Sequence, residues 1–306
     1  MGKYVLKRVV SIFITLFIVC TLTFAMMHAV PGGPFTGERN LPPKVLEALN
    51  KKYHLDDPVL VQYGDYLKGI VTLDLGPSYK KDGVMVKDML MQGFPVSAKL
   101  GFITSLLIIL VGVPLGIFSA LKRGRWPDYI VTILATLGIA VPTFVLGTLI
   151  LYVFGAKLNW IPTFGLDSWK CYIGPAVSLS GFSIAFVLRL TRSSMLEVMG
   201  QDYIRTARAK GLSWGRVIGK HALKNALIPV VTYIGPMIAG IMSGSFVTEK
   251  IFAIPGMGKF FVDAITNRDY TVIMGTTLFY AAFAGAMILV VDIVYVLLDP
   301  RIKIDG

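Results

Sequence analysis

Charged side chains are scarce in this sequence, and this scarcity sets the first limit on its class. Only 16% of the 306 residues are charged, whereas 55% are hydrophobic, and the mean hydropathy is +0.68. A soluble domain of this length needs more polar surface than such a composition supplies. The composition therefore predicts a protein that resides in a lipid bilayer.

The sequence also has few of the residues that form disulfides or bind metals. Cys20 and Cys171 lie in or beside apolar runs, and the three histidines fall in different segments. No CxxC spacing and no Cys/His cluster is present, so neither a disulfide nor a metal site is predicted. We find no convincing acid/base pair within one segment, and we expect no catalytic residue and no bound cofactor in this chain.

Two short motifs resemble catalytic sequences without their usual context. Residues 211–215 read G-L-S-W-G and match G-x-S-x-G, but that motif needs a preceding buried strand and a surrounding sheet. Residues 255–259 resemble the end of a phosphate-binding loop, yet Ala253 replaces its first glycine and Phe260 replaces its Ser or Thr. Neither motif is given a catalytic role.

Long apolar runs are what the sequence has instead. A hydrocarbon core of about 30 Å takes roughly 20 helical residues to cross. Six runs of about that length predict an all-α integral membrane protein with six transmembrane helices. They cover approximately residues 9–30, 98–121, 130–154, 171–190, 226–248 and 274–298.

Basic residues are distributed unevenly among the segments that connect these runs. The net charge is +3 before the first run, +2 over 122–129 and +5 over 191–225, and it is zero over 31–97 and over 249–273. Because positively charged loops are retained in the cytoplasm, we expect both termini and the two basic loops to be cytoplasmic. The first run exceeds a usual signal core and lacks a convincing cleavage site, so we expect it to remain as a helix.

The predicted organisation follows from this orientation. Segment 31–97 is expected to be an external cap with helices near 42–52 and 58–70. The parts of the chain are a cytoplasmic N-terminus with the first helix (1–30), the extracytoplasmic segment (31–97), a transmembrane core (98–298) with the cytoplasmic loop 191–225, and a cytoplasmic tail (299–306).

Small residues and prolines inside the runs indicate how the helices pack and bend. Gly112–Gly116 and Gly240–Gly244 each form G-x-x-x-G, a pattern that suggests helix contacts on the second and fifth spans, although it also arises by chance. Proline removes a backbone hydrogen bond and tends to kink a helix. Kinks are therefore expected at Pro114, Pro142 and Pro236.

Arg189 and Asp292 are ionisable residues near the inner ends of the fourth and sixth spans. Such residues usually face the protein interior. One hypothesis is that the two side chains pair or line an inner gate. The alternative is that each extends separately to the membrane interface.

The basic loop 191–225 has the pattern of helix, turn and helix. Gly211 is placed at the turn, and Ser213 is placed to cap a second helix. In the second helix Trp214, Val217, Ile218 and Ala222 recur at helical spacing, which predicts an amphipathic helix at the membrane surface. From the residues alone, the first helix is either a docking element for another protein or a simple interfacial loop.

This loop resembles the cytoplasmic coupling loop of importer-type ABC permeases, whose pattern is Glu-Ala-Ala, three residues, Gly, and later Ile-x-Leu-Pro. Ala207, Gly211 and Leu223 match strictly; Arg205-Thr206-Ala207 replaces Glu-Ala-Ala, and residues 221–224 replace Ile-x-Leu-Pro. The peptide and nickel branch of the family is indicated by RTARAKGL, HALKNALIPV, MMHAVPGG, DLGPSY, IFAIPGMGKFF, NRDY and DPRI. PFTGER with LPPKV is most similar to the B-type permeases of oligopeptide importers.

The resemblance implies a type I ABC importer permease fold in a bacterial inner membrane, with oligopeptides as cargo and dipeptides or nickel as alternatives. It implies a second homologous permease, two cytoplasmic ATPase subunits that bind ATP and Mg²⁺, and an external peptide-binding protein; membrane lipid is a further partner and nucleic acid is not. It assigns ATPase coupling to Arg205, Thr206, Ala207, Arg208, Ala209, Lys210, Gly211 and Leu223.

Two functions from other classes remain as rivals. A stand-alone secondary transporter or channel is expected to have internal repeats and several intramembrane carboxylates for ion coupling. We find no repeat, and Asp292 is the one carboxylate within a predicted span. A membrane receptor or scaffold without transport is the other rival, and it accounts poorly for the predicted kinks and the coupling loop.

Overall fold

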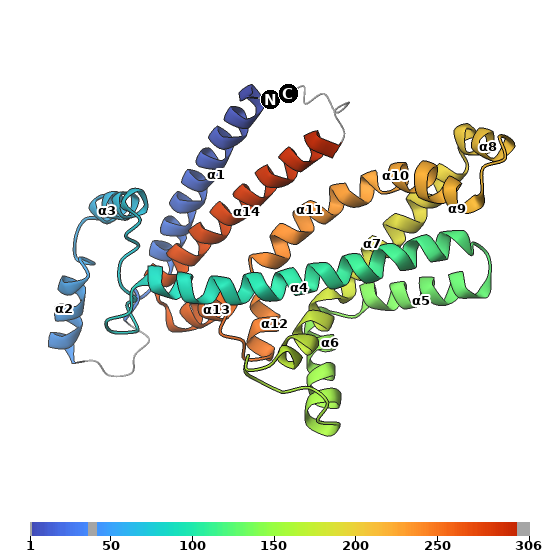
Figure 1. Ribbon diagram of the computed structural model, residues 1–306. Helices are drawn as coiled ribbons and strands as arrows, with labels where there is room; N and C mark the ends of the chain where they lie inside the picture. The colour runs from blue at the N-terminus through green and yellow to red at the C-terminus, as the bar shows by residue number, and fades with distance from the viewer. Residues whose placement is uncertain (1, 36–41, 299–306) are drawn as a thin grey trace. The chain divides into compact units, whose positions relative to one another are not determined.

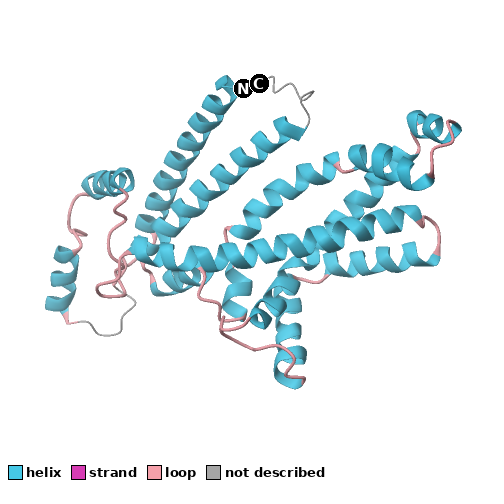
Figure 2. Cartoon of the chain, in the orientation of Figure 1, coloured by secondary structure: helices cyan, strands magenta, loops and turns pink. Residues whose placement is uncertain are grey.

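The computed structural model describes residues 2–35 and 42–298. Regular structure in this part of the chain is helical, apart from an isolated antiparallel bridge between Pro77 and Met85 (Figure 2). The predicted tail 299–306, the DPRI motif and most of PFTGER lie outside the described residues.

The helices follow one another in the order labelled in Figure 1. They are α1 (Gly2–Ala29), α2 (Pro43–Lys52), α3 (Val59–Thr72), α4 (Val86–Leu121), α5 (Trp126–Ala140), α6 (Thr143–Ile150), a π-helix (Leu151–Lys157), a 3₁₀ turn (Trp169–Tyr172), α7 (Ile173–Met199), α8 (Asp202–Ala209), α9 (Trp214–Arg216), a second π-helix (Val217–Ala222), α10 (Leu223–Ala226), α11 (Ile228–Met242), α12 (Phe246–Ile251), α13 (Met257–Asn267) and α14 (Tyr270–Leu298).

Five helical segments among the described residues are long and apolar enough to cross a membrane, and a bent pair makes up to six. The five single segments are Val5–Ala29, Val86–Leu121, Trp169–Met199, Ile228–Ile251 and Tyr270–Ile293. They confirm five of the six predicted spans as single helical segments. The predicted helices 42–52 and 58–70 are also present, as α2 and α3.

The third predicted span, 130–154, is wrong as a straight helix. Trp126–Ala140 and Thr143–Lys157 meet at an angle of 102°. Val141 has φ −85° and ψ 120°, an extended conformation that the ring of Pro142 imposes on the residue before it. The predicted kink at Pro142 is therefore confirmed, and it is a sharp bend.

The second predicted span also differs at its start. Helix α4 begins at Val86, twelve residues before the predicted position 98. The first turns of α4 contain polar side chains, including Lys87 and Asp88. These residues are helical but not apolar, so the apolar run in the sequence starts later than the helix.

The described chain divides into two compact units. Among the described residues, the first unit comprises 2–35, 42–97 and 255–290. Its core gathers Phe24, Val86, Met257 and Tyr270 among other apolar residues. Glycines allow close packing within it, because a Cβ on Gly275 would lie 2.5 Å from a methyl of Val86.

Buried Asp269 ties the loop between α3 and α4 to the start of α14. Its carboxylate accepts hydrogen bonds from the hydroxyl of Ser78, from the N–H of Tyr79 at 3.1 Å and from the hydroxyl of Thr271 at 3.0 Å. Arg268 precedes it in a left-handed conformation and donates to the carbonyl of Pro31. The NRDY motif thus has a structural role in the first unit.

Among the described residues, the second unit comprises 98–254 and 291–298. Within it α4 and α5 run beside α7 (Figure 1). A Cβ on Gly112 would lie 3.0 Å from Val187, and one on Gly116 would lie 2.6 Å from the carbonyl oxygen of Leu188. The helix contact predicted for the first G-x-x-x-G is therefore confirmed.

The second G-x-x-x-G motif makes no such contact within the described chain. A Cβ on Gly240 would have nothing within 4 Å. Gly244 follows the end of α11 and has a φ of +107°, so it belongs to a turn. The predicted helix contact at this motif is wrong for the described residues of this chain.

Candidate functional site

The basic loop between α7 and α11 has the predicted helix, turn and helix arrangement, and it lies in the second unit (Figure 1). Helix α8 ends at Ala209, and Gly211 follows with a φ of +76°. The N–H of Gly211 donates to the carbonyl of Arg208 at 2.9 Å. Glycine suits this position because the left-handed region costs it no steric strain.

The inner face of this loop is built into the ends of the long helices. Ile204 and Ala207 on α8 pack with Met195 at the end of α7, Ala120 at the end of α4, and Val217 of the second π-helix. Ile204 is 1% exposed and Val217 is fully buried. Helix α8 therefore shares one apolar core with the ends of α4 and α7.

The predicted coupling residues separate into two sets. Ala207 is buried and Leu223 packs against the loop core, so these two support the loop from inside. The other members are exposed: Arg205, Thr206, Arg208, Ala209, Lys210 and Gly211. Only the exposed set is free to touch another protein, and its role in coupling stays a prediction.

The exposed face of α8 is cationic and partly fixed by local contacts. Arg205 lies 3.6 Å from the carboxylate of Asp202, and the guanidinium of Arg208 lies 4.9 Å from the centre of the Trp214 ring. The amide of Asn225 donates to the hydroxyl of Tyr203 at 2.8 Å. The first contact lies within α8, whereas the Arg208–Trp214 and Asn225–Tyr203 contacts join the two arms of the loop.

The second arm of the loop differs in detail from the sequence prediction. Ser213 occupies the N-cap of α9, but its side chain makes no capping hydrogen bond. Val217 and Ala222 form the buried face as predicted, whereas Trp214 remains 47% exposed. Trp214 is not part of the buried apolar face, because its ring packs against the guanidinium of Arg208.

The residues of the hypothetical inner gate are both in the second unit. Arg189 on α7 is exposed, and its guanidinium donates to the hydroxyl of Thr136 on α5 at 2.6 Å. Asp292 lies partly buried on α14. The side chain of Arg189 thus contacts α5, and its pairing with Asp292 stays a hypothesis.

An ion pair at the loop between α4 and α5 was missed from the sequence. Asp128 is 3% exposed and accepts two hydrogen bonds of 2.8 Å from the guanidinium of Arg192 on α7. It also accepts from the hydroxyl of Ser119 at 2.5 Å and from the N–H of Gly124 at 3.0 Å. A bidentate, charge-assisted pair of this kind is strong and geometrically specific. It fixes the ends of α4, α5 and α7 just before the basic loop.

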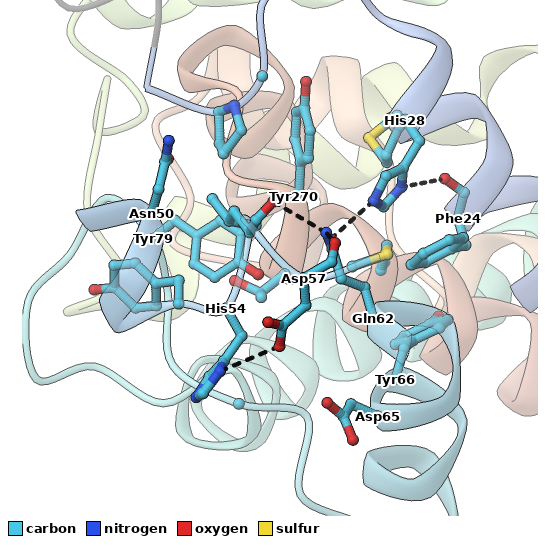
Figure 3. Close-up of a pocket in the computed structure, with 18 of the residues that line it drawn as sticks. Phe24, His28, Asn50, His54, Asp57, Gln62, Asp65, Tyr66, Tyr79 and Tyr270 are labelled. Carbon is cyan, nitrogen blue, oxygen red and sulfur yellow. Dashed lines mark hydrogen bonds and ion pairs between the residues drawn. The ribbon is translucent and has the colours of Figure 1, made fainter. Parts of the chain in front are cut away.

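The first unit contains a second candidate site, a cavity of about 800 Å³ (Figure 3). It is formed by the end of α1, by α2 and α3, by the loop that follows α3, and by the start of α14. Aromatic rings make up much of its wall: Phe24, Phe35, Tyr53, Tyr66, Tyr79 and Tyr270. Because these elements are far apart in the sequence, no local motif marks the cavity.

Hydrogen bonds fix one wall of this cavity. Nδ1 of His28 donates to the carbonyl of Phe24 at 2.9 Å, and Nε2 lies 3.1 Å from the side-chain oxygen of Gln62, as Figure 3 shows. The amide of Gln62 donates to the carbonyls of Leu55 and Asp57. The bend between α2 and α3 is thereby held against α1.

The hydroxyls of Tyr66 and Tyr79 remain neutral at physiological pH. Burial, followed by the charge of Asp269, raises the pKa of Tyr79 to about 12. Burial also raises the pKa of Tyr66 well above its usual range. Both hydroxyls therefore stay available as hydrogen-bond donors.

Two family descriptions match this sequence. "Binding-protein-dependent transport system inner membrane component" matches residues 112–304, and the description of the N-terminal part of such membrane components matches residues 1–101. The boundary between the two matches falls within α4.

Curated relatives are similar over nearly the full chain. The dipeptide transport system permease protein DppB of Bacillus subtilis is 49% identical, with 99% of each chain covered. The oligopeptide transport system permease protein OppB of Salmonella typhimurium is 45% identical, with 99% of this chain and 100% of the relative covered.

Solved structures share the fold at low sequence identity. A chain of the MetNI methionine ABC transporter in an inward-facing conformation aligns with a TM-score of 0.50 and 18% identity, over 66% of this chain and 94% of that one. A chain of an amino acid ABC transporter crystallised with histidines aligns with a TM-score of 0.50 and 15% identity, over 71% and 95%. The fold is that of the type I ABC importer permeases.

Proposed function

Because this chain belongs to the family of binding-protein-dependent transport system inner membrane components, we propose that it is the permease subunit of an ABC importer that carries oligopeptides across the bacterial inner membrane. The similarity to OppB and to DppB supports peptides as the cargo class. Dipeptides are the alternative, because DppB is at least as similar as OppB; nickel is a further alternative within the branch.

The proposal includes the partners that such an importer requires. They are a second permease of the OppC type, two ABC ATPase subunits of the OppD and OppF type, and an extracytoplasmic binding protein of the OppA type. ATP and Mg²⁺ belong to the ATPase subunits, and this chain is a transport subunit without an ATPase site. Its termini and the loop containing α8 are cytoplasmic, whereas α2 and α3 belong to the outer side.

The main observation in support of this function is that the α8 loop has a buried inner face and an exposed basic outer face. Its inner face is part of a core shared with the ends of α4 and α7, and its outer face exposes Arg205, Arg208 and Lys210. Closure of the ATPase dimer pushes on this outer face and moves the attached helices as a rigid body. The work comes from the different affinity of ATP for the inward-facing and outward-facing states.

Uptake by cells tests the cargo directly. Labelled di-, tri- and pentapeptides are supplied to cells that lack this chain, before and after the chain is restored. Restored pentapeptide uptake supports an oligopeptide importer, and rescue of dipeptides alone moves the assignment to the dipeptide branch. Absence of any rescue contradicts peptide import as the function.

A further inference from the structure

The turn between α4 and α5 presents three basic side chains (Figure 1). Residues 122–125 read K-R-G-R, and Lys122, Arg123 and Arg125 are all exposed. None of the three forms an ion pair with another residue that the structure describes. Asp128 is the one acidic residue between positions 121 and 140, and its buried carboxylate is already bound by Arg192. The turn therefore displays positive charge without a compensating carboxylate.

Hydrogen bonds hold the backbone of this turn in one conformation. The N–H of Arg125 donates to the carbonyl of Lys122 at 3.0 Å and closes the turn. Between them Gly124 has a φ of +73°, and its N–H donates to the carboxylate of Asp128 at 3.0 Å. Asp128 is in turn fixed by Arg192 of α7. A ligand that meets these cations binds to a preorganised backbone, which lowers the entropy cost of binding.

An exposed apolar stripe on α5 continues directly from the turn. Its members are spaced by three or four residues, so they share one face of the helix. Each is at least 47% exposed: Trp126, Tyr129, Ile130, Ile133, Leu134 and Leu137. The opposite face of α5 is buried and contains Asp128, Val131 and Ala135. The cations of the turn thus lie at one end of an apolar face that is directed away from the core of the second unit.

The order of groups along this face matches the order of groups in a phospholipid. Trp126 and Tyr129, 73% and 61% exposed, lie between the cations and the aliphatic part of the stripe. Amphipathic aromatic rings of this kind are enriched at the level of the lipid head groups. A soluble protein partner would account for the cations but not for the stripe, and a neighbouring membrane helix would account for the stripe but not for the cations. A phospholipid with a net negative charge accounts for both.

We propose that the α4–α5 turn and the adjoining stripe form a binding site for an anionic phospholipid. The head group meets Lys122, Arg123 and Arg125, and the acyl chains lie along the aliphatic side chains of α5. Each basic residue near a membrane surface contributes about 1 kcal/mol to the attraction of anionic lipid. The site requires only that α5 lies in a bilayer, so it is independent of the cargo and of the coupling role of α8.

Fluorescence quenching at Trp126 measures this binding locally. The chain has four tryptophans, and the other three are exposed, so Trp160→Phe, Trp169→Phe and Trp214→Phe leave Trp126 as the reporter. The full-length chain is placed in phosphatidylcholine nanodiscs that contain a minor share of acyl-brominated phosphatidylglycerol or, in a parallel sample, the same share of brominated phosphatidylcholine. Bromine quenches tryptophan only at close range. The anionic lipid is expected to show an apparent affinity at least about fivefold higher, the ratio that one basic residue at the surface supplies.

Two variants of equal charge separate a local site from general attraction. The first removes the cations of the turn: Lys122→Gln, Arg123→Gln and Arg125→Gln. It should bring the affinity ratio of the two lipids to about one while quenching by phosphatidylcholine stays unchanged. The second removes three exposed lysines of α2 and α3 in the first unit: Lys44→Gln, Lys51→Gln and Lys68→Gln. It should keep the ratio of the unmodified sequence.

A photo-cross-linking amino acid at position 129 shows what covers the stripe in the assembled importer. With p-benzoylphenylalanine in place of Tyr129, adducts with phospholipid are expected in cell membranes. Three results would overturn the proposal: equal quenching by the two brominated lipids, equal loss of preference in the two charge variants, or adducts of position 129 with an ATPase subunit or another permease and none with lipid.

Discussion

At the scale of single residues, Gly211 is where the account is most exposed to test. Its φ of +76° disfavours other residues, but a Cβ there would meet nothing within 4 Å. Gly211→Asp is therefore expected to insert and fold, since aspartate visits the left-handed region more readily than most residues. The new side chain and charge oppose docking at the turn, so peptide uptake should fall at least tenfold.

The matched control for this change is Gly215→Asp. Gly215 is exposed in the same loop, has space for a side chain and lacks a positive φ. It should retain more than half of the wild-type uptake. Equal uptake by Gly211→Asp and the wild type, at equal amounts in the membrane, would rule out the coupling role.

The buried ion pair of Asp128 is expected to matter for stability. Asp128→Asn leaves Arg192 without its charged partner, which costs about 3 kcal/mol when a buried pair is broken from one side. Thermal unfolding of the purified chain should show a clearly lower midpoint. Asp82→Asn removes an exposed ion pair with Lys52 and should shift the midpoint little. Equal midpoints for the two variants would contradict a structural role for Asp128.

At the scale of helices, close packing of α4 on α7 predicts opposite outcomes for two glycines. A Cβ on Gly116 would lie 2.6 Å from atoms of Leu188 and Thr191, so Gly116→Ala is expected to destabilise the chain by about 1–3 kcal/mol. Gly240 has open space and lies inside α11, so Gly240→Ala should be neutral or stabilise by up to about 1 kcal/mol. Chemical denaturation of the isolated chain compares them, and the reverse order would refute the packing.

Helix existence could be predicted from sequence because apolar length alone decides which segments cross a bilayer. The kink at Pro142 could be predicted as well, but its angle of 102° could not, since proline restricts Val141 without fixing how the two helical segments pack. The α8 loop was predictable because its turn glycine and buried positions are close in sequence. The Asp128–Arg192 pair joins residues 64 positions apart, and the cavity of the first unit joins α1, the stretch from α2 to the loop after α3, and α14, so neither leaves a local pattern.

At the scale of the whole molecule, the account assigns different tasks to different parts of the chain. The second unit carries the loop on which the ATPase subunits act and the proposed lipid site at the turn between α4 and α5, and the first unit carries the cavity with its aromatic lining. The coupling assignment depends on the transmembrane topology, with α8 cytoplasmic and α3 external. One measurement of contact can test that topology and the coupling mechanism together.

Cysteine cross-linking in the assembled importer is that measurement. Both native cysteines are buried and leave little background, so Ala209→Cys on α8 and Thr72→Cys at the end of α3 can be compared directly. The account predicts that position 209, and not position 72, forms cross-links to an ATPase subunit, that ATP changes their yield, and that they stop peptide uptake. Cross-links at position 72, or an ATPase subunit that never reaches position 209, would contradict the central claim that this chain couples ATP hydrolysis to import through α8.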